Sequence, residues 1–315
     1  RLPGMAVAVP SRDLLRTGNV AGRHARLGPP MRGVGPMQVI QPDEGPLIDA
    51  AGGIKASVAD IAKWLDVQLA LGEIPGGKRL WSKESAVEMW TPQVIVSSSD
   101  GGTDINPARP VMAGYALGWF VQDFRGRRLV NHSGGLSGQV TQTAMIPSVG
   151  IGVAVFSNTE DGVSGGIRNA ILDHLLGTTP AYDWVASYVA RNKLAQESAA
   201  AGMAAGEAKP PEGKPSLPLA AYAGRYRDAW YGDVVVTVKD KALHIDFVPT
   251  PVFKSALEPW GTDSFRTRFP IGAGEDAVVT FAVADGKVTG VKMKALSPLA
   301  DFSYDFHHLD FAPVG

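Results

Sequence analysis

The chain lacks cysteine altogether, and it also lacks an excess of charge of either sign. Without cysteine it can form no disulfide, no thiolate metal site and no cysteine nucleophile. Its 30 Lys and Arg residues nearly balance its 31 Asp and Glu residues, so no net field favours nucleic acid or an anionic membrane. No apolar run reaches the roughly 18 residues that cross a bilayer. The sequence therefore predicts no nucleic-acid partner and no membrane span, and its charge balance favours small neutral or mixed-charge ligands.

What the sequence does contain is enough apolar material for a sizeable core. Its 315 residues are 45% hydrophobic, which fits two domains or one large domain with an appendage. We predict a first domain over residues 1–194 and a small antiparallel β-domain over residues 219–315. Between them, residues 195–218 are dominated by Ala, Gly, Glu, Lys and Pro, and this composition is typical of a linker, with a helical start.

Local signals in the first domain indicate two helices followed by strands. Ser57 is placed to cap a helix that stops at Gly72, and Ser82 is placed to cap a shorter one. From Tyr115 the pattern changes to strands bounded by Gly or Pro, the first over residues 115–124. Consecutive strands with short turns favour an antiparallel sheet, so we predict an α+β fold with helices flanking the sheet.

Later signals add one more helix and two hairpins. Residues 164–177 read as a helix that packs across the sheet. The β-domain contains two hairpin candidates, with turns at residues 240–241 and 285–286, the second being the Asp-Gly pair typical of a type I′ turn. The apolar face expected of the helix consists of Ile167, Ile171, Leu172 and Leu175.

One stretch concentrates backbone freedom beside reactive side chains. Residues 129–140, LVNHSGGLSGQV, hold one His, two Ser and three Gly after a run of strand-forming residues. A strand edge lined with Gly lets a ligand approach closely, and a backbone N–H there can point at a developing negative charge. The alternative is that Gly134, Gly135 and Gly138 only form a bulge and a tight turn.

The order of several motifs resembles the serine β-lactamase-like hydrolases. The segments RLPGM, AGGIKASVADIAKWL, YALGW, HSGG and GIGVAVFSN follow one another as they do in that group, which includes class C β-lactamases, penicillin-binding proteins and family VIII esterases. The resemblance covers roughly residues 1–190. From LAAYAGRY onward the chain is similar to the lipocalin-like β-domain that is often appended to members of the group.

The resemblance implies roles for residues of the glycine-rich strand. His132, Ser133 and Gly134 stand where the group has its K-T-G motif or a relative of it. His132 would support the polar network around the nucleophile, Ser133 would hydrogen-bond the substrate, and Gly134 would give clearance. Gly135 would lend its backbone N–H to the oxyanion hole. Tyr115 and Asn158 are further substrate-binding candidates.

Two motifs of the group are missing. No Ser is followed by Lys three positions later, and no Tyr is followed by Asn two positions later. In the group both motifs lie upstream of the segment that RLPGM resembles, so we expect the nucleophile Ser, with its Lys and Tyr, before Arg1. The chain then resembles a β-lactamase-like domain without its N-terminal segment, which a companion fragment or a longer precursor would supply. This chain alone is expected to be inactive.

The function implied is that of a serine hydrolase acting through an acyl-enzyme. The substrate would be a small ester, an amide or short peptide, including one of a D-amino acid, or a β-lactam; His132 in place of Lys tilts the expectation away from a dedicated β-lactamase. No metal or organic cofactor is implied. The alternative is a catalytically inactive homologue that binds peptides or muropeptides. The resemblance favours a periplasmic or secreted location, and the composition leaves the cytoplasm open.

Other candidate residues have simpler interpretations. Ser137 lacks the full G-x-S-x-G spacing of a nucleophile elbow. His307 and His308 are adjacent, which on a strand points them to opposite faces, and no further ligand completes a tetrahedral site. His24 has no readable partner. Trp119 is expected in the core.

Overall fold

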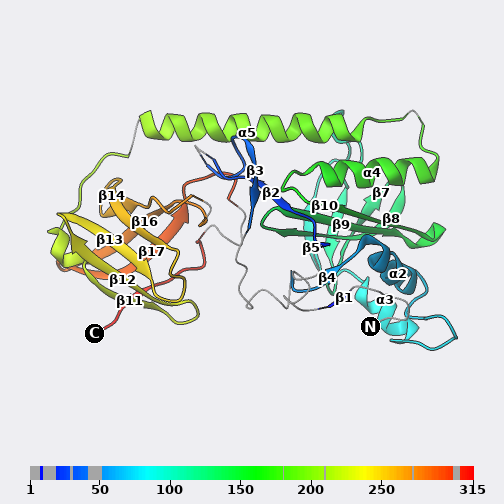
Figure 1. Cartoon of the computed structure of the whole chain (residues 1–315), viewed down its shortest axis with the longest axis horizontal. Coiled ribbons are helices and arrows are strands. Elements are labelled where there is room, and N and C mark those ends of the chain that lie inside the picture. Colours follow the sequence, from blue (N-terminus) through cyan, green and yellow to red (C-terminus); the bar gives the residue numbers. More distant parts are fainter. Residues whose placement is uncertain are drawn as a thin grey trace. The chain divides into compact units, whose positions relative to one another are not determined.

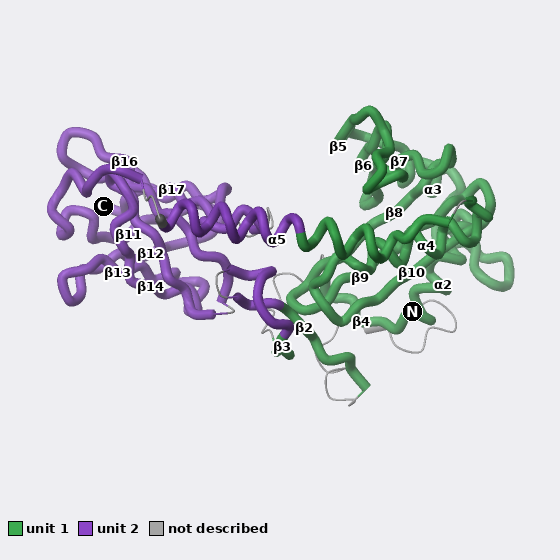
Figure 2. The backbone as a smooth tube through the Cα atoms, turned by 90° about the horizontal axis from the view of Figure 1, so that it is seen from above, with its two compact units in different colours: residues 1–25, 38–193 green, residues 26–37, 194–315 purple. Residues whose placement is uncertain are grey.

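The computed structural model describes residues 8–9, 19–28, 31–41, 52–179, 181–208, 211–271, 273–300 and 306–315. The chain forms two compact units, one of residues 1–25 and 38–193 and the other of residues 26–37 and 194–315 (Figure 2). The opening segment RLPGM lies outside the described residues. The domain boundaries expected from the sequence stay a prediction.

The first unit is built on a six-stranded antiparallel sheet in which every strand lies beside the next one in the chain (Figure 1). Short turns join most of these strands, as the Gly and Pro punctuation of the sequence predicts. Residues Arg125 and Gly126, both at positive φ, form one such turn. In sheet order the strands are β10 (Ile151–Ser157), β9 (Gln139–Ile146), β8 (Arg127–Leu136), β7 (Phe120–Phe124), β6 (Met112–Tyr115) and β5 (Val94–Ser98).

The predicted strand over residues 115–124 is wrong in its middle. Strand β6 ends at Tyr115 and β7 begins at Phe120, and Gly118 turns the chain between them at φ 82°. The Ala116 N–H donates to the Trp119 carbonyl at 2.8 Å across this turn. Trp119 is buried in the core, as predicted.

Helices lie on both faces of the sheet, and two of their N-caps match the sequence signals. Helix α2 (Val58–Leu69) begins after Ser57, whose hydroxyl accepts from the Asp60 N–H at 3.2 Å. Helix α3 (Lys83–Met89) begins after Ser82, whose hydroxyl accepts from the Ser85 N–H at 3.1 Å. Figure 1 shows α2 and α4 (Val163–Leu176) on opposite sides of strands β8 to β10. An antiparallel sheet with helices on it confirms the α+β class.

The buried face predicted for α4 is wrong for three of its four residues. Leu172 is fully buried, but Ile167 and Ile171 are each 37% exposed and Leu175 is 51% exposed. The buried residues are mostly small or polar: Ser164, Gly165, Gly166, Asn169 and Asp173.

Small residues are needed on α4 because another helix packs tightly against it. A Cβ at position 165 would lie 2.8 Å from the Tyr188 ring, and one at position 166 would lie 2.9 Å from the Trp184 carbonyl. Both of these partners belong to α5 (Trp184–Ala208). The spacing of apolar residues alone cannot reveal a helix face whose small residues allow a second helix to pack closely against it.

Helix α5 extends into the segment that the composition suggests as a linker. It ends at Ala208, so residues 195–208 are helical. The boundary between the two compact units falls within it, at residues 193 and 194. No helix among the described residues is long and apolar enough to cross a membrane.

The second unit is an eight-stranded antiparallel sheet that curls toward a barrel. The two ends of the sheet come together. Val291, in the strand at one end, and Phe311, which directly precedes the strand at the other end, exchange backbone hydrogen bonds of 2.9 and 3.1 Å. Both predicted hairpin turns are present, with Asp240, Lys241, Asp285 and Gly286 at positive φ. In sheet order the strands are β17 (Lys287–Ala295), β16 (Ala277–Ala284), β15 (Ser264–Arg266), β14 (Lys254–Pro259), β13 (Ala242–Phe247), β12 (Gly232–Lys239), β11 (Gly224–Asp228) and β18 (Ala312–Pro313).

Aromatic side chains fill the interior of this second unit. The rings of Tyr222 and Phe281 lie 5.1 Å apart, and those of Phe247 and Phe269 lie 6.2 Å apart, in edge-to-face contacts. The core also contains Tyr226, Phe265 and Phe311, each at most 3% exposed. The unit is therefore a packed β-domain.

Candidate active site

The glycine-rich stretch forms the last part of β8, where the strand has a neighbour on one side only. Pairing with β7 ends at the Phe120–Asn131 pair, whereas pairing with β9 continues to the Leu136–Gln139 pair. Among the residues that the structure describes, residues 132–136 therefore have β9 on one edge and a free strand edge on the other. A free edge offers backbone donors and acceptors to a ligand.

The register shows which backbone groups face that free edge. Paired residues in antiparallel strands alternate between bonding to each other and turning their N–H and C=O groups to the far edge. The Leu136–Gln139 pair closes the turn at Ser137 and Gly138, so the N–H groups of Ser133 and Gly135 point away from β9. The same alternation counted from the turn between β7 and β8 gives the same result.

The side chain of His132 is held by a hydroxyl and a carbonyl. Its Nδ1 lies 2.6 Å from the Ser133 carbonyl oxygen, so Nδ1 carries a proton and donates it. Its Nε2 lies 3.3 Å from the Tyr115 hydroxyl. In the neutral imidazole Nε2 is the acceptor, and Tyr115 donates. The fold therefore brings two of the predicted residues, from β6 and β8, into one hydrogen-bonded chain.

Phe120 completes this cluster, and the sequence reasoning missed it. Its ring centroid lies 4.7 Å from that of Tyr115 and 5.5 Å from that of His132. It is the first residue of β7, directly after the core residue Trp119. Its contact with Tyr115 follows from their pairing across the turn between β6 and β7. If the turn at Gly118 is recognised in the sequence, the pairing of Tyr115 with Phe120 can be predicted.

Ser133, Gly134 and Gly135 are all exposed. A Cβ at Gly134 would lie 2.8 Å from the Thr141 hydroxyl on β9, so this glycine leaves room for a neighbouring side chain. A Cβ at Gly135 would meet nothing within 4 Å. Gly135 is therefore open on its side-chain face and, by the register, presents its N–H at the free edge.

Asn158 contacts a different segment of the first unit. Its Nδ2 donates to the Gly22 carbonyl at 2.9 Å, and its own backbone carbonyl lies 3.0 Å from Nδ1 of His24. The side chain fixes β2 (Arg23–Arg26) to the chain that follows β10. The sequence offered no partner for His24, because residues 24 and 158 meet only through the fold.

The histidine pair near the C-terminus does not lie on a strand as assumed. His307 and His308 are in a turn, with ring centroids 3.6 Å apart. Within the described residues, no group of three or more His, Cys, Asp or Glu side chains could hold a metal ion.

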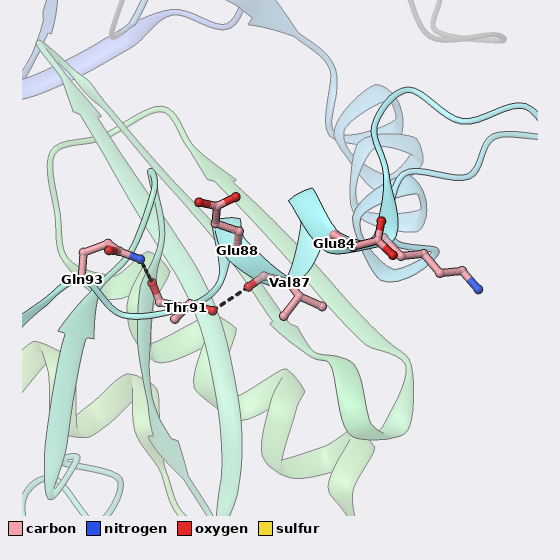
Figure 3. Close-up of a pocket in the computed structure, with 6 residues that line it drawn as sticks. Glu84, Val87, Glu88, Thr91 and Gln93 are labelled. Atoms are coloured by element: carbon pink, nitrogen blue, oxygen red, sulfur yellow. Dashed lines mark hydrogen bonds between the residues drawn. The ribbon is translucent and has the colours of Figure 1, made fainter.

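A surface hollow lies on α3 and on the chain that leads from it to β5, next to Tyr115: the Gln93 N–H donates to the Tyr115 carbonyl at 2.8 Å. It has a volume of about 580 Å³ (Figure 3). Figure 3 marks two hydrogen bonds among the residues that line it. The Thr91 hydroxyl donates to the Val87 carbonyl, and Nε2 of Gln93 donates to the Thr91 carbonyl, both at 2.9 Å. None of the predicted site residues lines it; the lining residues are Lys83, Glu84, Val87, Glu88, Thr91 and Gln93.

Two family models match the chain, one for each part. The model described as Beta-lactamase matches residues 3–178, and a domain of unknown function, DUF3471, matches residues 208–313. The chain is 32% identical over 216 residues to the unguisins hydrolase of Aspergillus violaceofuscus, covering 63% of this chain and 37% of that protein. It is 25% identical over 198 residues to the unguisins hydrolase of Aspergillus campestris, covering 61% and 35%. The chain spans about a third of the length of these curated relatives.

Among solved structures, the octameric penicillin-binding protein homologue of Pyrococcus abyssi aligns with 98% of this chain and 56% of its own. The sequence identity is 20% and the TM-score is 0.47.

Proposed function

The chain belongs to the beta-lactamase family, and we propose that it supplies the oxyanion-donating strand of a serine hydrolase that acts through an acyl-enzyme. The observation that carries the proposal is the free edge of β8 beyond Asn131, where the Gly135 N–H points away from β9. A backbone N–H fixed in a strand can stabilise the negative charge that develops on the carbonyl oxygen during acyl transfer.

The nucleophile of this hydrolase is a Ser on polypeptide outside these 315 residues, with Lys or Tyr as its base. This follows from the lack of any Ser-x-x-Lys or Tyr-x-Asn in the sequence. His132, oriented by Tyr115 and by the Ser133 carbonyl, supports the polar network beside that nucleophile. Ser133 hydrogen-bonds the acyl side of the substrate. The substrate is a small ester, an amide or short peptide, including one of a D-amino acid, or a β-lactam.

Two substitutions at one position test the role of Gly135. Gly135→Pro removes the N–H, and because that group faces the free edge, no bond to β9 is lost. Gly135→Ala keeps the N–H and places its methyl group in open space, so it is the matched control. In the hydrolase assembled with its nucleophile-bearing polypeptide, Gly135→Pro should lower kcat about 100- to 1000-fold. Gly135→Ala should retain the parent rate. Equal rates for both variants would contradict the proposal.

Labelling with a serine-reactive phosphonate separates this function from the alternative of an inactive peptide- or muropeptide-binding homologue. We expect the adduct on a Ser outside the chain, and no turnover of a p-nitrophenyl ester by the 315 residues alone. An adduct on Ser133 or Ser137 would overturn the assignment of the nucleophile. Peptide binding with no adduct anywhere would support the binding homologue.

A further inference from the structure

The tip of the β8–β9 hairpin is held from outside the sheet by three hydrogen bonds. The Gly138 N–H donates to Oε1 of Glu160 at 2.7 Å. The Gly138 carbonyl accepts from the His24 N–H at 3.2 Å, and the Ser137 carbonyl accepts from Nη1 of Arg23 at 3.4 Å. The bond to Glu160 is the shortest of the three and its acceptor is a carboxylate, so it is the strongest.

The segment that carries Glu160 is itself fixed to β2. The Glu160 N–H donates to the His24 carbonyl at 3.1 Å, and His24 forms an isolated parallel bridge with Thr159. This segment directly follows β10, whose last residue, Ser157, pairs with Val140 of β9. The hairpin tip, β2 and the segment after β10 are therefore joined by one closed set of backbone and side-chain hydrogen bonds.

These contacts lie where β8 has lost its other neighbour. Within the part of the chain that the structure describes, β8 pairs only with β9 from residue 132 to the tip, and a two-stranded hairpin is marginally stable by itself. Gly135 lies three residues before Gly138, the residue that Glu160 holds. The position of the Gly135 N–H therefore depends on the hairpin and on the support of its tip.

We propose that Glu160 is a positioning residue: by binding the Gly138 N–H it holds the hairpin tip so that the Gly135 N–H keeps its place at the free edge of β8. The inference rests on the proposed function, in which Gly135 donates to the oxyanion. Glu160 acts through the backbone of the hairpin. A displacement of about 1 Å at a reacting group can cost 100-fold in rate, so the anchor has catalytic consequences.

The first test needs only the 315-residue chain, labelled with ¹⁵N-glycine. Glu160→Ala should shift the amide resonances of both Gly138 and Gly135 and should speed hydrogen exchange at Gly138 by about tenfold or more. Glu160→Gln should restore most of the parent spectrum, because its amide oxygen can accept the same hydrogen bond. The matched control is Glu88→Gln on α3, which exchanges an exposed Glu outside this set of contacts. An unmoved Gly135 resonance in Glu160→Ala would refute the inference.

The second test uses the assembled hydrolase with the same variants beside Gly135→Pro. Glu160→Ala should lower kcat about tenfold with KM within twofold, a smaller loss than deletion of the donor itself. If Glu160→Ala turns over at the parent rate while Gly135→Pro is impaired, the positioning role is wrong and the proposed function stands. If Gly135→Pro also works at the parent rate, the proposed function fails.

Discussion

Gly135 and Gly138 lie three residues apart on the same hairpin, and the structure predicts opposite effects for replacing each with Ala. Gly138 has φ 78°, and a Cβ there would lie 2.6 Å from Cβ of Arg23 and 2.9 Å from the His24 backbone nitrogen. Gly135 lies in the strand, and its Cβ would meet nothing within 4 Å. Only the first substitution adds strain.

The expected magnitudes follow from these distances. Gly138→Ala should lower the free energy of unfolding by about 2–5 kcal/mol, because it combines left-handed backbone strain with overpacking against backbone atoms that cannot move aside. Gly135→Ala should raise it by about 0.5–1 kcal/mol, since Ala loses less backbone entropy than Gly in a strand.

Urea unfolding followed by tryptophan fluorescence measures both changes. Most of the tryptophans report on the first unit, namely Trp64, Trp81, Trp90, Trp119 and Trp184. The midpoint for Gly138→Ala should fall by about 1–2 M, while that for Gly135→Ala should not fall. The unfolding transition of the second unit, followed by circular dichroism, provides an internal control, because neither Gly135 nor Gly138 belongs to the second unit. Identical midpoints for the two variants would refute the reasoning.

Four further outcomes are expected. Asp173→Ala should lower the free energy of unfolding, measured calorimetrically, by about 3–5 kcal/mol. The Asp173 carboxylate accepts hydrogen bonds of 2.7 and 2.9 Å from Arg125 and one of 2.6 Å from the Trp184 N–H, and the substitution leaves these donors without an acceptor. Burial opposes ionisation of Asp173, but these donors outweigh it and hold the pKa of Asp173 below the ordinary 3.8. The contribution of Asp173 to the free energy of unfolding is therefore present above pH 3.8 and is lost as the pH falls through the lower folded pKa. The stability of Asp173→Asn should accordingly depend less on pH in that acidic range. Asp228→Asn should destabilise only the second unit, by about 1–3 kcal/mol in a thermal scan, because three backbone N–H groups lose a carboxylate. Tyr115→Phe should slow the assembled hydrolase without lowering the free energy of unfolding by more than about 1 kcal/mol, and an unchanged kcat would remove Tyr115 from the site.

The sequence predicted those parts of the fold whose causes are local. The caps at Ser57 and Ser82 work because a hydroxyl three residues upstream can reach a helical N–H. The Asp285–Gly286 turn needs positive φ at both positions, which this residue pair tolerates. The family resemblance, drawn from the order of several weak motifs, is confirmed by the family model over residues 3–178. Ordered motifs carry information that no single one contains.

The sequence failed where a contact between distant segments decides the outcome. On α4 the apolar residues Ile167 and Ile171 are half-exposed, because the helix turns Gly165 and Gly166 toward α5 to allow close packing. Likewise, Asp173 is buried because it binds Arg125, 48 residues away in the chain. A hydrophobic pattern reflects the free energy gained when apolar side chains leave water. It gives no information about a partner helix or about an ion pair between residues far apart in the sequence.

The candidate site combines both kinds of cause. The sequence predicts the residues at its centre, because His132 and Gly135 lie in one short motif. Gly135 lies beyond the end of β7, because the turn at Gly118 makes β7 begin at Phe120. The hairpin tip that follows it is bound by Glu160, 25 residues downstream of Gly135, and no local pattern indicates that contact. In the proposed function the Gly135 N–H can reach a substrate only because one edge of β8 is free, so the contacts that end β7 and bind the hairpin tip matter as much as the glycine motif.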